Sequence, residues 1–191
     1  MPSVATTSRR AAAMPADERR AAIVEAALPL VAAHGETVTT RQIAEAAHVA
    51  EGTIFRVFAD KDELLLATLD AALDQAPVEA AYAAIDADLP FEQQLVAAVS
   101  LIQQRIADVW AVVSNLGPRL QTLAHRPLTD SDALTRLFEP EADRLNVPPR
   151  QAARLLRALT LSLAHPMMVE DASTAEEIVD HFLHGALRRA D

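Results

Sequence analysis

The segment spanning residues 43–61 constrains the fold most. It reads IAEAAHVAEGTIFRVFADK. Apolar residues recur at helical spacing on both sides of an interruption near His48, which predicts two short helices joined by a tight turn. Two short helices in this arrangement form a helix-turn-helix, whose second helix enters the major groove of DNA. The segment therefore predicts a DNA-reading element, and the remaining residues are expected to dimerise and control it.

The composition predicts an all-α protein. Apolar residues make up 51% of the 191 residues, and only four glycines are present. Alanine and leucine favour helices, while scarce glycine disfavours an architecture with many hairpins. The chain contains no cysteine, so disulfides and thiolate metal sites are excluded, and a reducing cytoplasm is the expected location.

Helical spacing and stop signals predict the N-terminal helices. We expect a helix over residues 17–34, ended by Gly35 and kinked at Pro29, because proline removes a backbone hydrogen bond and clashes one turn back. The reading helix is predicted over residues 51–58.

Two capping signals place the neighbouring helices. Thr39 can cap one helix, with Gln42 as its capping-box partner, and Asp60 can cap another with Glu63. Pro77 is expected to break or bend the helix that Asp60 begins.

Further helices are predicted from periodicity and prolines, and Ser173 with Glu176 should cap the last of them. They span residues 78–87, 90–116, 119–125, 130–146, 149–169 and 173–189. The longest carries an apolar stripe that should face a core, formed by Leu95, Val99, Ile102, Ile106, Val109 and Val113.

The candidate DNA contacts surround the reading helix. Arginine pairs with guanine or phosphate and glutamate accepts from cytosine, whereas small residues let the backbone approach the duplex. Hydroxyls, cations and helix N-termini suit the flanking phosphates. The candidates are Thr39, Thr40, Arg41, Ala50, Glu51, Gly52, Thr53, Phe55, Arg56 and Lys61.

Residues 39–64 resemble the pattern of the TetR (tetracycline-repressor-like) family of transcriptional regulators. With the preceding helix the resemblance covers about 50 residues, and the C-terminal STAEEIVDHFLHGAL is similar to the family's last helix more weakly. The matching positions include Thr39, Ile43, Ala44, Ala47, Val49, Gly52, Thr53, Ile54, Phe58, Lys61 and Leu64.

The resemblance implies a particular domain organisation. It divides the chain into a three-helix helix-turn-helix DNA-binding domain at 16–61 and a helical effector-binding and dimerisation domain at 62–191. The residues before them, 1–15, lack acidic groups and the apolar stretch of a signal peptide, and we expect a disordered arm there. The resemblance also implies a homodimer that packs through the last two helices of each subunit, and a small-molecule pocket in each C-terminal domain.

Four positions depart from the family pattern. His48 replaces a turn glycine, at a cost of roughly 1 kcal/mol if its φ is positive. Ala50 replaces a capping serine, which loses about 1 kcal/mol. Phe55 lacks a tyrosine hydroxyl, and Val57 replaces a polar or aromatic phosphate contact. Because the buried positions are kept, we expect the fold to survive and DNA binding to be weaker or more selective.

The net charge of −10 is unevenly distributed. Residues 1–62 carry seven basic and eight acidic groups, a net of −1, whereas residues 63–191 carry ten and nineteen, a net of −9. The acidic body could orient a near-neutral reading head on DNA, although an acidic surface also simply keeps a cytoplasmic protein soluble.

The effector site is less well marked by the sequence. Candidate pocket groups are Arg105, Trp110, Asn115 and His125, although the single tryptophan fits a core position better. His181 and His184 lie three residues apart without a third ligand near in sequence, so the rim of a subunit interface is favoured over a metal site.

No feature of the sequence predicts catalysis, a cofactor or a membrane span. The zinc-protease, phosphate-loop and G-x-S-x-G patterns are absent, and no apolar run approaches the roughly 18 residues of a membrane helix. We expect a non-enzymatic repressor that an unidentified small molecule releases from its operator, with repression itself resting on the resemblance. The alternative is an all-helical dimeric ligand-binding or scaffold protein that has lost DNA reading.

Overall fold

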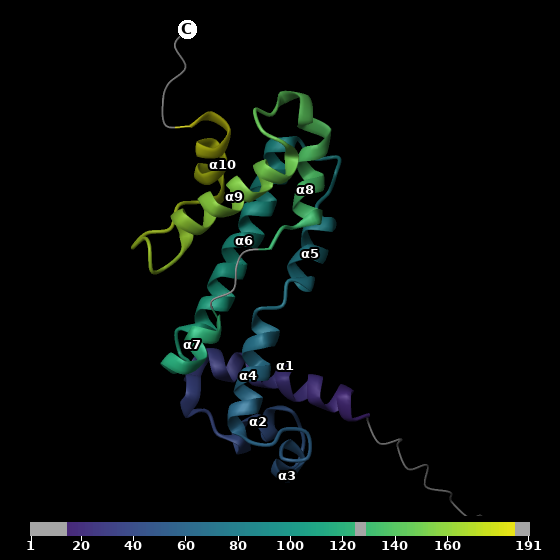
Figure 1. The fold of residues 1–191 in the computed structure, drawn as a ribbon, viewed down its shortest axis with the longest axis vertical. Helices are drawn as coiled ribbons and strands as arrows, with labels where there is room; N and C mark the ends of the chain where they lie inside the picture. Colours follow the sequence, from purple (N-terminus) through teal and green to yellow (C-terminus); the bar gives the residue numbers. More distant parts are fainter. Residues whose placement is uncertain (1–14, 125–128, 186–191) are drawn as a thin grey trace, which may run out of the picture.

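A computed structural model describes residues 15–124 and 129–185, and all regular structure in these ranges is helical (Figure 1). The all-α prediction is therefore confirmed. The arm predicted at residues 1–15 lies outside the described residues except for Pro15, as do residues 125–128 and 186–191. Figure 1 shows a smaller group of N-terminal helices at one end of the molecule and a larger helical group at the other.

The N-terminal group forms around a core of its own. Its side chains come from successive turns of the helices, and the fully buried ones include Ile23, Val31, Ile43, Ile54 and Phe58. The elements are α1 (Ala16–His34), the 3₁₀ turn η1 (Gly35–Thr37), α2 (Thr40–Ala46), α3 (Glu51–Ile54) and α4 (Lys61–Ala72).

Both predicted caps of this group are confirmed. The Thr39 hydroxyl accepts from the backbone N–H of Gln42, whose side chain accepts in turn from the Thr39 backbone. The Asp60 carboxylate accepts from the N–H of Glu63 at 2.8 Å, whereas the Glu63 carboxylate reaches Ala59 instead of Asp60. These bonds satisfy backbone donors that a helix leaves unpaired at its start.

One helix prediction needs correction here, whereas α1 continues through the exposed Pro29 to His34, the end that the sequence predicts. The reading helix is shorter than predicted, because α3 ends at Ile54 and the chain then tightens into a turn with i→i+3 bonds from Arg56 and Val57. The turn brings Phe58 into the core, where it is 1% exposed.

The second group of helices is arranged around α6. Its core contains Leu95, Leu134, Leu156 and Ile178, and the Phe138 ring meets Phe91 and Phe182 edge to face at 5.7 and 5.9 Å. The elements are α5 (Ala76–Ala83), α6 (Phe91–Val113), α7 (Pro118–Ala124), α8 (Asp132–Phe138), the 3₁₀ helix η2 (Glu139–Arg144), α9 (Pro149–Ala164) and α10 (Ala175–His184).

Several predicted boundaries shift by one turn or less. The break expected at Pro77 comes earlier, at the end of α4, and Pro77 stands in the first turn of α5, where its missing N–H costs nothing. Thr174, not Ser173, caps α10, with Glu177 completing the capping box. Both residue pairs fit the same spacing rule, so the sequence left their order open.

Other helices end sooner than expected. The helix predicted over 130–146 begins at Asp132 and becomes the 3₁₀ helix η2 just before Pro140. The one predicted over 149–169 ends at Ala164, and α10 ends at His184, before Gly185 with a φ of +72°.

The long helix α6 joins the two groups. It contacts α1 and α4 in one group and α5, α8, α9 and α10 in the other. By length and composition α6 could cross a membrane, alone among the described helices. A search for uninterrupted apolar runs misses this because Gln104, Arg105 and Asp108 interrupt the run.

The far end of α6 is fastened to the N-terminal group. The side-chain amide of Asn115 donates to the carbonyl of Ala32 at 2.8 Å, and the Glu36 carboxylate accepts from the N–H of Gly117 at 2.9 Å. Val112, just before this point, is part of the N-terminal core. Motion of α6 would therefore reach the N-terminal group directly.

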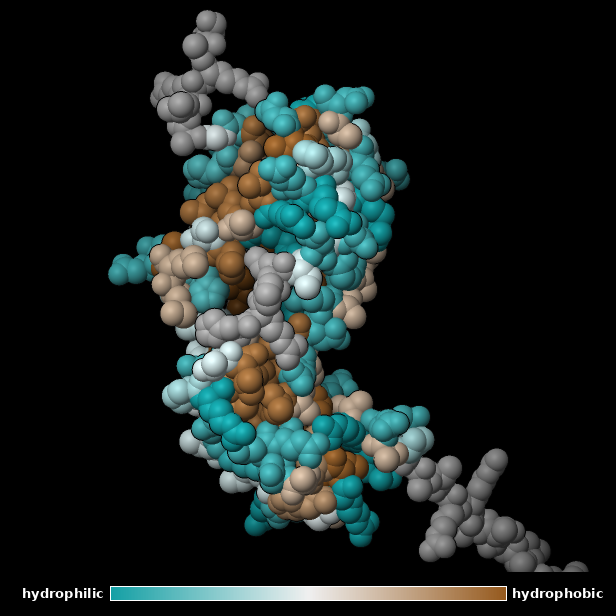
Figure 2. Space-filling model, in the orientation of Figure 1, coloured by the Kyte–Doolittle hydropathy of each residue, from teal (hydrophilic) through white to brown (hydrophobic). Residues whose placement is uncertain are grey.

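Few large apolar side chains are exposed, and several of them gather near α9. Leu155 lies on α9 with 47% of its surface exposed, and Met167 and Met168 follow its end at 73% and 62%. Figure 2 shows hydrophobic side chains over the region of α9 and α10. Phe55 and Leu123 are the other exposed large apolar residues in the described chain.

Candidate DNA-reading surface and ligand cavity

The turn between α2 and α3 has the predicted geometry. His48 adopts a φ of +55°, the strained region expected where the family pattern has glycine. The N–H of Val49 then returns to the carbonyl of Ala44 at 2.9 Å. Ala50 precedes α3 without a side-chain cap, as the missing serine predicts. The turn thus forms despite two unfavourable residues.

The outward face of α3 is open. Ala50, Glu51, Gly52, Phe55 and Arg56 are exposed, whereas Thr53 is half-buried and Ile54 is buried. The Arg56 side chain makes no hydrogen bond or ion pair with any described residue. An exposed guanidinium beside an exposed aromatic ring can read a guanine and contact a thymine methyl group.

The other predicted contacts already have partners within the protein. The hydroxyl of Thr40 donates to Glu51 at 2.6 Å, and Arg41 pairs with Glu45 at 3.0 Å. The Thr39 hydroxyl is held in the α2 capping box. These are exposed contacts, which DNA phosphates could replace at little cost.

Lys61, a predicted phosphate contact, also has a partner within the protein. Its ammonium group donates to the backbone carbonyl of Glu36, and the side chain is half-buried. One of its three donors is therefore used to join α4 to the turn after α1.

Arg20 on α1 fixes the end of the reading segment, a role that the helix-turn-helix pattern does not reveal. Its guanidinium donates to the carbonyl of Val57 at 2.7 Å, pairs with Glu63 at 3.0 Å and lies 4.2 Å from the centre of the Phe58 ring. The Ala59 N–H, followed by Arg20, holds the pKa of Glu63 below its usual range. A charged residue of α1 thus sets the angle at which α3 is presented.

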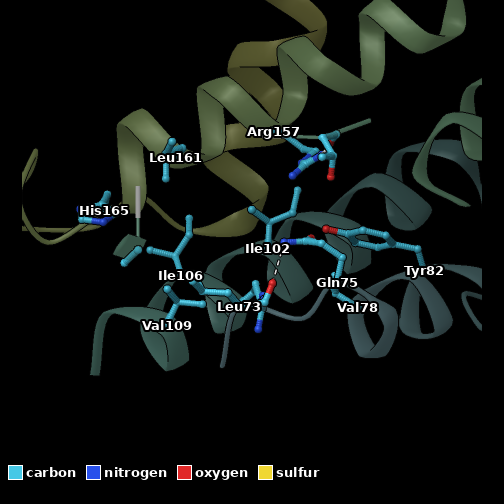
Figure 3. Close-up of a pocket in the computed structure, with 13 residues that line it drawn as sticks. Leu73, Gln75, Val78, Tyr82, Ile102, Ile106, Val109, Arg157, Leu161 and His165 are labelled. Carbon is cyan, nitrogen blue, oxygen red and sulfur yellow. Dashed lines mark hydrogen bonds between the residues drawn. The ribbon is translucent and has the colours of Figure 1, made fainter. Parts of the chain in front are cut away.

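A cavity of about 350 Å³ lies in the second group of helices, between the end of α4, α5, α6 and α9 (Figure 3). This volume lies in the range of small-molecule sites. The apolar part of the wall consists of Leu73, Val78, Ile102, Ile106, Val109 and Leu161. Half of these residues come from the predicted apolar stripe of α6, which therefore faces a cavity as well as a core.

Polar groups are set into this apolar wall. Figure 3 shows Gln75, Tyr82 and Arg157 toward one end and His165 at the other, beyond Ile106 and Leu161. Arg157 donates to the carbonyl of Thr129, which also lines the cavity. A long apolar body with polar groups at its end would match this arrangement.

Arg105, a predicted effector residue, lines the cavity. One of its nitrogens, Nη1, donates to the carbonyl of Ala72, the last residue of α4. The other, Nη2, is buried and has no hydrogen-bond partner. Burial lowers the pKa of the Arg105 guanidinium, but an arginine stays charged at neutral pH.

The other predicted effector residues do not line this cavity. Trp110 borders an adjoining hollow, where its ring meets His165 edge to face at 5.0 Å. Asn115 binds α1 instead, and His125 lies outside the described residues. Sequence reasoning missed Gln75, Tyr82, Arg157 and His165, because no local pattern distinguishes them from other polar residues on helices.

Tyr82 gives the cavity a pH-dependent property that can be measured. Burial raises the pKa of the Tyr82 phenol to about 12 from its ordinary value of 10.0. Folding favours the neutral phenol, so the contribution of Tyr82 to stability is complete below pH 10 and is lost as the pH rises toward 12. We expect the free energy of unfolding to fall by about 2–3 kcal/mol across this window.

Tyr82 is the only tyrosine in the chain, so the ultraviolet absorbance of tyrosinate reports on it alone. Titration of the folded protein should place the midpoint of tyrosinate formation near pH 12. Tyr82→Phe should remove most of the loss of unfolding free energy at high pH. A midpoint at the ordinary tyrosine value would contradict the burial of this phenol.

Sequence comparison identifies the reading head. Residues 23–68 match the family model described as "Bacterial regulatory proteins, tetR family". The match begins within α1 at residue 23, covers α2 and α3, ends within α4 at residue 68, and includes Arg56 and Lys61. Over these residues the chain is similar to the tetR family. The resemblance in residues 39–64 is thereby confirmed.

Solved structures share the fold of this protein over most of the chain. A TetR/AcrR-family regulator from Thermobifida fusca is 21% identical, with a TM-score of 0.57 over 90% of this chain and 100% of that one. A TetR-family regulator from Haemophilus influenzae is 18% identical, with a TM-score of 0.54 over 88% and 96%.

The TetR-like regulator LfrR from Mycobacterium smegmatis, solved with proflavine, is 22% identical, with a TM-score of 0.51 over 90% of this chain and 99% of that chain. At these identities the likeness supports the fold, a helix-turn-helix domain followed by a larger helical domain.

Proposed function

We propose that this protein is a ligand-responsive transcriptional regulator of the tetR family, in which an effector bound in the α4–α9 cavity releases the protein from its operator. The exposed face of α3, with the unpartnered Arg56 at its end, carries the proposal. Arg20 and the buried Ile54 and Phe58 hold that face rigidly, so little flexibility is lost on binding. The cytoplasm, where the operator is accessible, is the expected location.

Operator binding requires two reading heads. Helix-turn-helix dimers place their heads in successive major grooves, about 34 Å apart. The apolar residues exposed around Leu155, Met167 and Met168 support a homodimer through α9 and α10. Exposed large apolar side chains on and just after one helix are unfavourable in a monomer and are typical of an interface.

Leu155→Glu should separate the dimer. A charge placed in an apolar interface loses its water without gaining a partner, so the dimer dissociation constant should rise at least about tenfold. Leu123→Glu is the matched control, since Leu123 is equally exposed, at 48%, but lies on α7. Sedimentation velocity over a range of concentrations measures both variants. Equal dissociation by the two would place the interface elsewhere.

The cavity is connected to the reading head by two contacts. Arg105 joins the cavity wall to the last carbonyl of α4, whose first residue, Lys61, holds the turn after α1. α6 extends from the cavity to Asn115, which binds α1. An effector that fits one position of these helices better would change the separation of the heads, because differential affinity alone shifts an equilibrium.

The small-molecule part of the proposal also has support from a similar fold. LfrR was solved in complex with proflavine, and the present chain encloses a cavity of about 350 Å³. DNA repels the acidic residues 63–191, so the near-neutral reading head would approach the duplex first.

Selection from a pool of randomised duplexes tests the function. The full chain should enrich a pseudo-palindromic sequence, and its affinity should fall linearly with the logarithm of salt concentration. A shuffled duplex serves as control and should bind at least about a thousandfold more weakly. If no sequence is enriched even at low salt, the alternative of a ligand-binding or scaffold dimer without DNA reading is favoured.

A further inference from the structure

The cavity has a charge opposite to that of the protein. The chain as a whole carries 27 acidic and 17 basic groups, excluding histidine. Among the described residues that line the cavity are two arginines and a histidine, and neither aspartate nor glutamate. A wall of this kind attracts anions and disfavours cations, because no carboxylate is present to balance a positive ligand.

Arg105 has a donor without a partner in this wall. Its Nη2 is buried and makes no hydrogen bond, although Nη1 binds Ala72. Asp74 and Asp108 lie close enough to act on the guanidinium, but neither lines the cavity. A buried donor left unsatisfied is costly, so a ligand acceptor that the Arg105 guanidinium turned to meet would gain that energy on binding.

Further donors are gathered near Arg105. Arg105 and Arg157 both lie close enough to Tyr82 to influence its phenol electrostatically. The phenol is neutral at physiological pH and can donate a hydrogen bond, and the Gln75 amide lies on the same side in Figure 3. Two guanidiniums, a phenol and an amide together suit a planar carboxylate better than a single hydroxyl.

The rest of the wall is apolar. Val78, Ile102, Ile106, Val109 and Leu161 offer no hydrogen-bonding side chain, so they favour a hydrocarbon or aromatic body. From these observations we infer that the cavity binds small monocarboxylates with an apolar body, the carboxylate lying against Arg105 and the body extending along α6. The inference rests on the proposed function only in treating this ligand as the effector.

Binding of matched compounds to the full chain tests the inference. One series is octanoate, octan-1-ol and octylamine, and the other is 4-butylbenzoate, 4-butylbenzyl alcohol and 4-butylbenzylamine. In at least one series the carboxylate should bind about tenfold or more tightly than the alcohol, with the amine weakest, by titration calorimetry. If neither series prefers the carboxylate, the inference is overturned.

Arg105→Met tests which residue selects the anion. The variant should lose the preference of carboxylate over alcohol, reducing it to about threefold or less, while the alcohol binds as before. Arg154→Gln is the control, since Arg154 on the same helix as Arg157 also holds the segment beside the cavity, through Asp130, but lines no part of the wall. It should keep the preference.

Thermal denaturation of both variants checks that they fold. A retained preference in folded Arg105→Met would overturn the role of Arg105. Should that variant not fold, the comparison of the two compound series with the unaltered chain still decides the ligand class.

A second measurement separates this inference from the proposed function. Operator duplex is titrated into protein with each compound present. Release by the carboxylates supports both proposals. Release by the amines or alcohols alone would overturn the carboxylate inference and leave the regulator intact. Selective carboxylate binding by a protein that enriches no operator would support the inference and contradict the regulator.

Discussion

Replacing Gly35 with alanine is expected to destabilise the folded chain by about 2–6 kcal/mol, from backbone strain and overpacking together. Gly35 has a φ of +56°, and a Cβ there would lie 1.9 Å from the carbonyl oxygen of Asn115. That oxygen belongs to the backbone at the end of α6, so it can move only if the contact between α1 and α6 opens. Urea unfolding followed by circular dichroism measures the change.

Two other glycines separate the two causes. Gly52→Ala introduces neither backbone strain nor overpacking, because its backbone is helical and no atom lies within 4 Å of the added Cβ. The stability of this variant should therefore stay within about 1 kcal/mol of the parent chain. Gly185→Ala meets strain alone, with a φ of +72° and open space, and should cost about 1–2 kcal/mol. If Gly35→Ala behaves like Gly52→Ala, the close contact between α1 and α6 is wrong.

The elements that local chemistry determines were predictable. The capping box at Thr39, the cap at Asp60 and the positive φ at His48 follow from residue type and spacing, because their interactions span four residues or fewer. The same reasoning misplaced the α10 cap by one residue, since Ser173 and Thr174 satisfy the same rule. Only packing of α10 on α6 and α9 selects between them.

The contacts between distant segments were not predictable in the same way. The apolar spacing of α6 predicts a buried stripe, but it cannot show that Ile102 and Ile106 border an unfilled space. Asn115 reads as a polar pocket residue, yet its partner is a carbonyl 83 residues earlier in the chain. Arg105 was correctly associated with the cavity, whereas its unpaired nitrogen is visible only once α4 and α6 are packed together.

The same distinction applies to the reading head. Its sequence pattern placed Arg56 on the outward face of the reading helix and Arg41 at the flanking phosphates, and folding gives their side chains different partners. Arg41 is paired with Glu45, and that hydrogen bond raises the pKa of its guanidinium, whereas the Arg56 side chain has no partner among the described residues. Arg56 therefore has all its donors available for a base edge.

Arg56→Ala should reduce operator affinity far more than affinity for other DNA. A base contact by arginine is worth about 1–3 kcal/mol, and a dimer makes it twice, so the operator dissociation constant should rise about 30-fold to 10⁴-fold. Shuffled duplex should lose much less, because it offers no matching guanine. Equilibrium binding to the selected operator and to its shuffled form measures both losses.

Arg41→Ala is the matched comparison, since its side chain is 79% exposed and a phosphate can take the place of Glu45. It should weaken operator and shuffled duplex alike and reduce the salt slope by about two per dimer. Lys61→Ala should do the same, with an additional loss of stability from the Glu36 contact. If Arg56→Ala weakens both duplexes equally, Arg56 contacts the phosphates, and sequence must be read by the other exposed residues of α3.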